Sequence, residues 1–289
     1  MSGEREMNAR TGKEPGYVVQ AESGRRPVFT DTQQRRRLPD RRGADGALMQ
    51  IYGHRGSPSA HAPENTLASV EAALSGGADG VEVDVRLTAD GVAVCCHDPN
   101  MQRVAGVSRG VRSLTVDELA AIRVGGHRVP TVAEVMTAVA GRGRLVLDLK
   151  PEQRPLHLLS AIADAAHEAA VSGSLELTLS SAEPMILEAC AGVAANVERA
   201  VIVNGPETPS QILAQALHRG DRALHVQMRT LFTTRDLVRA AQQHGLTIRA
   251  WTVNRLVDAR LLRLLGVDAV ITDVPAEMRR GLQPARLPV

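Results

Sequence analysis

Residues 51–98 decide the fold and the chemistry of this chain, and they read IYGHRGSPSAHAPENTLASVEAALSGGADGVEVDVRLTADGVAVCCHD. From Val81 to Val85 valines alternate with acids. Because successive side chains of a strand point to opposite faces, Glu82 and Asp84 share one face and the valines share the other. Close carboxylates repel unless one is protonated or a cation lies between them, and their oxygens suit Mg²⁺ or Ca²⁺. The alternative for this segment alone is an antiparallel strand with its acids in solvent.

Two histidines and an arginine accompany these acids. His54 and Arg55 follow a short apolar run and are flanked by glycines, which permit a tight turn. The guanidinium fork suits phosphate, and a neutral imidazole takes or gives a proton near pH 7. The Thr-Ala-Asp-Gly segment at 88–91 is typical of a tight reversal, and it folds His97 back toward the acids. Two histidines beside one acidic pair favour a general acid and a general base.

A third strand pattern, Leu145 to Lys150, repeats this arrangement. Val146, Asp148 and Lys150 share one face, so an acid and a lysine emerge together. Lys150 is the only lysine after Lys13 in a chain that otherwise uses arginine. A specific need for a compact ammonium is favoured there, and a buried ion pair with Asp148 is the alternative.

Strand and helix patterns alternate from Gln50 onward. Eight strands are expected, beginning near residues 50, 81, 145, 175, 200, 223, 247 and 269. Eight β/α units in about 230 residues predict an α/β fold, the (β/α)8 TIM barrel, whose catalytic groups gather at the C-terminal strand ends. A short insertion at 99–129 follows the second strand. Capping-box spacing at Thr115 and at Thr131 predicts two short helices.

Other residues near the strand ends have open roles. Trp251 lies near the end of the seventh strand, where its ring either closes one side of the pocket or packs inside the barrel. Glu64 and Asn65 open the first helix as caps, with orientation of Arg55 by Glu64 as the alternative. Asp273 ends the eighth strand and is expected to shape the loop rather than to perform chemistry.

Several short motifs, taken in order, resemble the glycerophosphodiester phosphodiesterase family, a branch of the phospholipase C-like barrels. They are His-Arg-Gly at 54–56, Pro-Glu-Asn-Thr at 63–66, Glu-x-Asp at 82–84, Thr-x-Asp-Gly at 88–91, His-Asp at 97–98, Pro-Thr-Val-Ala-Glu at 130–134, Asp-Leu-Lys at 148–150, Trp-Thr-Val-Asn at 251–254 and the closing segment at 266–275. The resemblance implies hydrolysis of small glycerophosphodiesters to glycerol 3-phosphate and an alcohol such as choline, ethanolamine or glycerol.

The resemblance also implies roles for the site residues. Three acids hold one divalent cation, Mg²⁺ or Ca²⁺, namely Glu82, Asp84 and Asp148. Arg55 and Lys150 neutralise charge on the phosphate oxygens. His54 and His97 form the acid and base pair, with the assignment between them open. Asp148 stands where the family usually has Glu, so the preferred metal is open as well.

Two alternatives differ in function. A lysophospholipase D or phospholipase C-like enzyme acting on lipids needs an apolar rim, which residues 99–129 do not show. The other alternative is a non-catalytic barrel that binds phosphorylated metabolites or partners, although all seven expected catalytic, metal and phosphate-binding positions are filled.

The rest of the chain indicates the domain limits, the cellular location and the partners to expect. Residues 1–46 hold ten Lys or Arg against seven Asp or Glu and few apolar residues, so 1–47 is expected to be a disordered basic extension before a barrel at 48–282 and a tail at 283–289. No secretory signal or transmembrane segment is expected. Three cysteines without metal spacing predict core positions and a reducing, cytoplasmic setting. The mixed charge of the extension argues against a nucleic-acid partner, and the oligomeric state stays open.

Overall fold

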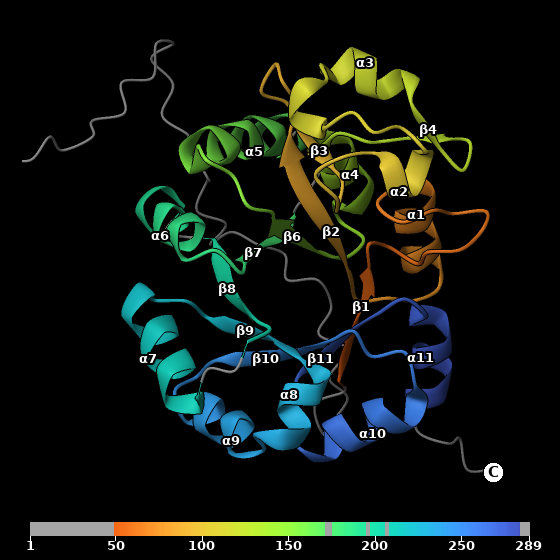
Figure 1. The fold of residues 1–289 in the computed structure, drawn as a ribbon. Helices are drawn as coiled ribbons and strands as arrows, with labels where there is room; N and C mark the ends of the chain where they lie inside the picture. The colour runs from red at the N-terminus through yellow and green to blue at the C-terminus, as the bar shows by residue number, and fades with distance from the viewer. Residues whose placement is uncertain (1–48, 171–174, 195–196, 206–207, 284–289) are drawn as a thin grey trace, which may run out of the picture.

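Eight parallel strands close into a barrel in the computed structural model, which describes residues 49–170, 175–194, 197–205 and 208–283. The strands are β1 Gln50–His54, β2 Gly80–Leu87, β6 Arg144–Leu149, β7 Glu176–Ser181, β8 Glu198–Val203, β9 Ala223–Gln227, β10 Thr247–Trp251 and β11 Ala269–Thr272. They follow one another in this order, and β1 pairs with both β2 and β11, which closes the barrel (Figure 1). The predicted TIM barrel is confirmed.

Helices surround these strands on the outside (Figure 1). They are α1 Leu67–Ser75, α4 Val132–Val139, α5 Pro155–Ala170, α6 Pro184–Val193, α7 Pro209–Arg219, α8 Met228–Thr233, α9 Asp236–Gln243, α10 Leu256–Leu264 and α11 Pro275–Leu282. The valines of β2 pack with α1, α4 and α5 in one apolar core. The other face of β2, with its two acids, therefore lies toward the barrel interior.

The reading of β2 as a strand with solvent-exposed acids is wrong. β2 runs parallel to β1 and β6. Its two acids are buried, with exposures of 5% for Glu82 and 1% for Asp84. Only the last residues of β2 pair antiparallel, with β3 Ala93–Cys95, which returns the chain toward His97.

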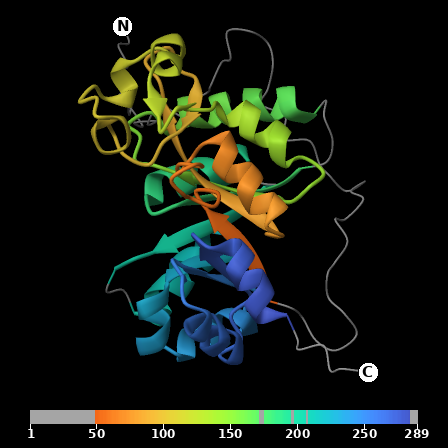
Figure 2. The same ribbon diagram turned by 90° about the vertical axis from the view of Figure 1, so that its right-hand side faces the viewer.

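The insertion, residues 99–129, packs on one side of the barrel and folds around its own core (Figure 2). It contains α2 Gln102–Ala105, the 3₁₀ helix η1 Val111–Ser113, α3 Val116–Ala121, and the hairpin of β4 Arg123–Val124 and β5 His127–Arg128. Both predicted capping boxes are present, at the start of α3 and of α4. The insertion is therefore an ordered subassembly beside the mouth of the barrel.

The remaining expectations have mixed outcomes. The predicted basic extension and all of the tail except Gln283 lie outside the described residues. Cys95, Cys96 and Cys190 are buried and free, as predicted for core positions. Within the described ranges, none of the helices is long and apolar enough to cross a bilayer.

Candidate active site

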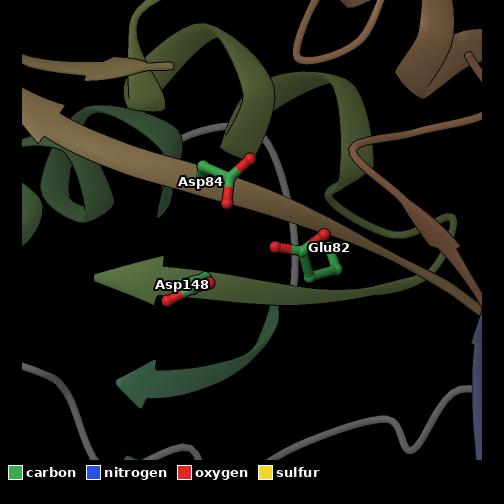
Figure 3. Close-up of side chains that lie close together, drawn as sticks. All are labelled: Glu82, Asp84 and Asp148. Atoms are coloured by element: carbon green, nitrogen blue, oxygen red, sulfur yellow. The ribbon is translucent and has the colours of Figure 1, made fainter. Parts of the chain in front are cut away.

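Three carboxylates of β2 and β6 meet inside the barrel, close to the level where β1 ends, since Glu82 pairs with His54 and Asp84 with Asp148. Glu82, Asp84 and Asp148 each place an oxygen within 4.8 Å of the others (Figure 3). Burial, reinforced by the charge of Asp84, raises the pKa of Glu82 to about 7. Burial also raises the pKa of Asp148. These raised pKa values show that the buried cluster disfavours the ionised form of both carboxyl groups.

Two fixed cations reach this cluster. Lys150 Nζ lies 2.6 Å from Asp84 Oδ1 and 2.6 Å from Asp148 Oδ2. Arg55 Nε lies 3.1 Å from Asp84 Oδ2. Although burial acts in the opposite direction, these two cations lower the pKa of Asp84. The ion pair between Lys150 and Asp148, which is the alternative to a phosphate-binding role for Lys150, is present, and it extends to Asp84.

The donor set fits a hard divalent cation. Three carboxylates against one ammonium and one guanidinium leave a single negative charge when all are ionised. The nearest partner of Glu82 is a backbone donor, because Glu82 Oε2 accepts from the Arg55 N–H at 3.0 Å. All-oxygen ligands with residual negative charge suit Mg²⁺ or Ca²⁺.

The turn after β1 is held in an uncommon backbone conformation. Arg55 and Asn65 have φ values of 52° and 56°, and they are the non-glycine residues with positive φ in the part of the chain that the structure describes. The Asn65 N–H donates to the Arg55 carbonyl at 3.0 Å, which joins the two ends of the turn. Such strain at a mouth loop is typical of a functional site.

The side-chain amide of Asn65 hydrogen-bonds to Asp84 through both its nitrogen and its oxygen. Its Nδ2 donates to Asp84 Oδ2 at 2.7 Å, and its Oδ1 accepts from the Asp84 N–H at 3.0 Å. The expectation that Glu64 and Asn65 cap the first helix is wrong, because the N-cap is Thr66. Glu64 instead accepts from Arg55 Nη1 at 2.9 Å, as the alternative proposed.

Each predicted catalytic histidine has its own carboxylate. His54 Nδ1 lies 2.7 Å from Asp273 Oδ1, and His97 Nδ1 lies 2.7 Å from Asp98 Oδ1. A carboxylate at Nδ1 favours the tautomer that leaves Nε2 for proton transfer. Burial lowers the pKa of His54, but the hydrogen bond to Asp273 and the charge of Glu82 outweigh it and raise the pKa.

Sequence reasoning missed two further contacts. Asp273 does more than shape its loop, since it contacts His54 and also accepts from Asn254 Nδ2 at 2.6 Å. Arg86 donates from Nε and Nη2 to the His97 carbonyl at 3.0 and 2.7 Å. The available signal for Arg86 was its spacing, two residues after Asp84 on the same face of β2.

Trp251 packs against side chains inside the barrel. Its Nε1 donates to the His225 carbonyl at 3.0 Å, and its ring packs against the cluster of Tyr52, Val146, Ala269 and Ile271 inside the barrel. These contacts agree with the alternative in which Trp251 packs inside the barrel. The residue is nevertheless partly exposed.

Comparison with known proteins agrees with this geometry. The glycerophosphodiester phosphodiesterase of Caldanaerobacter subterraneus subsp. tengcongensis is 29% identical over 237 residues, covering 78% of this chain and 94% of that protein. A phosphodiesterase of Oleispira antarctica, solved with the product sn-glycerol-3-phosphate, superposes with a TM-score of 0.74 at 26% identity, covering 81% of this chain and 97% of that one. The Thermotoga maritima glycerophosphodiester phosphodiesterase gives a TM-score of 0.67 at 28% identity, covering 81% and 98%.

The fold, the site and these similarities define a phosphoric diester hydrolase on a TIM barrel. The chain belongs to the glycerophosphoryl diester phosphodiesterase family, whose model matches residues 54–277. Because this is a family of enzymes, membership in it argues against the alternative of a non-catalytic barrel that only binds phosphorylated metabolites.

Proposed function

We propose that the protein hydrolyses small glycerophosphodiesters to glycerol 3-phosphate and an alcohol in a reaction that depends on a divalent cation. The observation that carries this proposal is one buried acidic cluster in which Glu82 and Asp148 interact electrostatically with His54 and His97, each of which pairs with its own carboxylate. The product bound in the Oleispira antarctica enzyme supports glycerol 3-phosphate as the phosphorylated product.

The residues divide the chemistry between them. Glu82, Asp84 and Asp148 would hold Mg²⁺ or Ca²⁺, which when bound supplies Lewis acidity toward a phosphoryl oxygen. Arg55 and Lys150 neutralise charge that builds on the phosphoryl oxygens.

Proton transfer belongs to the histidines. One of His54 and His97 accepts the proton of the attacking oxygen, and the other donates a proton to the leaving alcohol. The attacking oxygen is that of water, or a neighbouring glycerol hydroxyl whose cyclic phosphate water then opens. In the cyclic route the second step reverses the two roles and returns each imidazole to its original protonation state. In direct attack by water the base ends protonated and the acid deprotonated, and proton exchange with solvent restores both.

A lipid substrate is less well supported. The large apolar side chains that are exposed in the described residues are Leu156, Met185, Leu217, Val257, Leu261 and Leu264. All of them lie outside the insertion, whose apolar residues form its own core. The insertion therefore offers no apolar rim to a lipid tail.

The test is release of glycerol 3-phosphate from glycerophosphocholine and glycerophosphoglycerol by the purified protein with Mg²⁺, with Ca²⁺ and with EDTA. We expect turnover that requires the cation. Cleavage of lysophospholipids in place of these diesters would assign a lipid enzyme, and no turnover of either class would contradict the proposal.

The Asp273–His54 pair predicts a pH effect. The hydrogen bond and the charge of Asp273 raise the pKa of His54, so Asp273→Asn lowers that pKa. The limb of the pH–rate profile that reports His54 therefore moves to lower pH. Movement of the acidic limb makes His54 the base, and movement of the alkaline limb makes it the acid. The control is Asp164→Asn, an exposed acid on α5. A profile unchanged by Asp273→Asn would contradict the pairing.

A further inference from the structure

One residue of the insertion connects the two sides of the site. Arg103, on α2, donates from Nε to Asp98 Oδ2 at 2.6 Å. It also donates from Nη1 to Glu64 Oε2 at 2.8 Å and from Nη2 to Glu64 Oε1 at 2.7 Å. Three donors of one planar guanidinium are therefore committed to two carboxylates that come from different loops.

Each of these carboxylates also contacts a residue proposed to act on the substrate. The other oxygen of Asp98 lies 2.7 Å from His97 Nδ1. Glu64 Oε1 also accepts from Arg55 Nη1 at 2.9 Å. A continuous series of charge-assisted hydrogen bonds thus runs from His97 through Asp98, Arg103 and Glu64 to Arg55.

Electrostatics agree with this geometry. Burial acts to raise the pKa of Asp98, but hydrogen bonds from Arg103 and His97 lower it to about 2. Burial also acts to raise the pKa of Glu64, but Arg103 and Arg55 outweigh burial and lower this pKa. Both carboxylates therefore stay ionised, and they remain acceptors for His97 and Arg55 across the neutral pH range.

The importance of Arg103 lies in geometry rather than in stability. Its side chain is 49% exposed, and ion pairs of such exposure contribute little to folding. A rigid fork fixes the direction of both carboxylates at once, which a flexible ammonium does not do. Residues that orient catalytic groups in this way affect rate more than stability.

We propose that Arg103 is a positioning residue that couples the orientation of His97 to that of Arg55, and that through it the insertion takes part in catalysis. This inference rests on the proposed function, because it assumes that His97 transfers a proton and that Arg55 binds the phosphate. Arg103 itself contacts neither the acidic cluster nor the reacting atoms in this scheme.

The experiment compares Arg103→Ala and Arg103→Lys with Arg109→Ala. Arg109 lies in the same insertion, is 51% exposed and pairs with Glu118, so it matches Arg103 in setting without joining the series. We expect kcat to fall about 10–100-fold in Arg103→Ala and to stay low in Arg103→Lys. Arg109→Ala should stay within about 2-fold of the wild type, as expected for surface pairs.

Two further readouts separate positioning from a general structural effect. Millimolar guanidinium should restore part of the kcat of Arg103→Ala, while methylammonium should not, because only the planar ion reproduces the fork. In a Glu64→Gln/Asp98→Asn background, Arg103→Ala should cost less than about 3-fold, because its partners are already altered. Thermal unfolding of each variant checks that the protein is folded.

The outcomes are distinguishable. Wild-type kcat in Arg103→Ala, with His97→Ala inactive, would overturn this inference and leave the proposed function standing. An equal loss in Arg109→Ala, no rescue by guanidinium, or the full loss in the doubly altered background would also overturn it. Full activity in His97→Ala would show that His97 is not the proton-transfer residue that this inference assumes, whereas no turnover by the wild type would show that the proposed function itself fails.

Discussion

Replacing either His54 or His97 with alanine is expected to lower kcat on glycerophosphocholine by about 10²–10⁴-fold, the range of general acid–base catalysis. Each imidazole is held at Nδ1 by its own carboxylate at 2.7 Å, so its loss removes a group already oriented for proton transfer. The acidic cluster with Arg55 and Lys150 remains in both variants. KM should therefore change much less than kcat.

The two variants should differ once the leaving group is activated. With a nitrophenyl ester of glycerol 3-phosphate, departure of the alcohol needs no proton, so the variant that lacks the general acid regains most of its rate. The variant that lacks the base does not. His157→Ala, an exposed histidine on α5, is the matched control and should keep the wild-type rate. Full activity in either variant on glycerophosphocholine, or recovery of both on the activated ester, would contradict the assignment.

The sequence alone predicts the barrel and the acidic cluster because both depend on local periodicity. The alternation at Val81 to Val85 determines which side chains face inward, and the same rule brings Asp148 and Lys150 to the same end of β6. Parallel closure then places the ends of β1, β2 and β6 side by side. Local pattern and barrel topology are together sufficient for these contacts.

Contacts that depend on loop conformation cannot be predicted from the local periodicity of the sequence. Asp273 meets His54 across 219 residues of sequence, and it does so because β11 and β1 are neighbours in the closed barrel. Asn65 reaches Asp84 from a residue at φ 56°, a conformation that no periodicity predicts. Arg103 lies in an insertion whose packing follows from its own apolar core. Such residues became identifiable only from the three-dimensional structure.

Glu82→Gln is expected to lower activity strongly and yet to stabilise the cation-free protein. The folded-state pKa of Glu82 is raised from 4.5 to about 7 by burial and by Asp84, so the stability of the protein in EDTA falls as the pH rises through this window. A neutral amide removes that loss and can still accept from the Arg55 N–H. Above pH 7 we expect the variant in EDTA to be more stable by about 1–3 kcal/mol.

Addition of the cation should reverse the order of stability. A ligand that binds only the folded protein stabilises it by about 2.7 kcal/mol at a hundred times its Kd. Wild-type protein should therefore gain stability with Mg²⁺ or Ca²⁺, whereas Glu82→Gln should gain little, and activity should fall by at least about 10²-fold. Glu188→Gln, an exposed acid on α6, should behave as the wild type in both conditions. A variant that is less stable than the wild type in EDTA, or that keeps the cation-dependent gain, would show that Glu82 is a structural acid rather than a ligand. The opposite signs of the two effects identify a ligand, because loss of a purely structural carboxylate lowers stability with and without the cation.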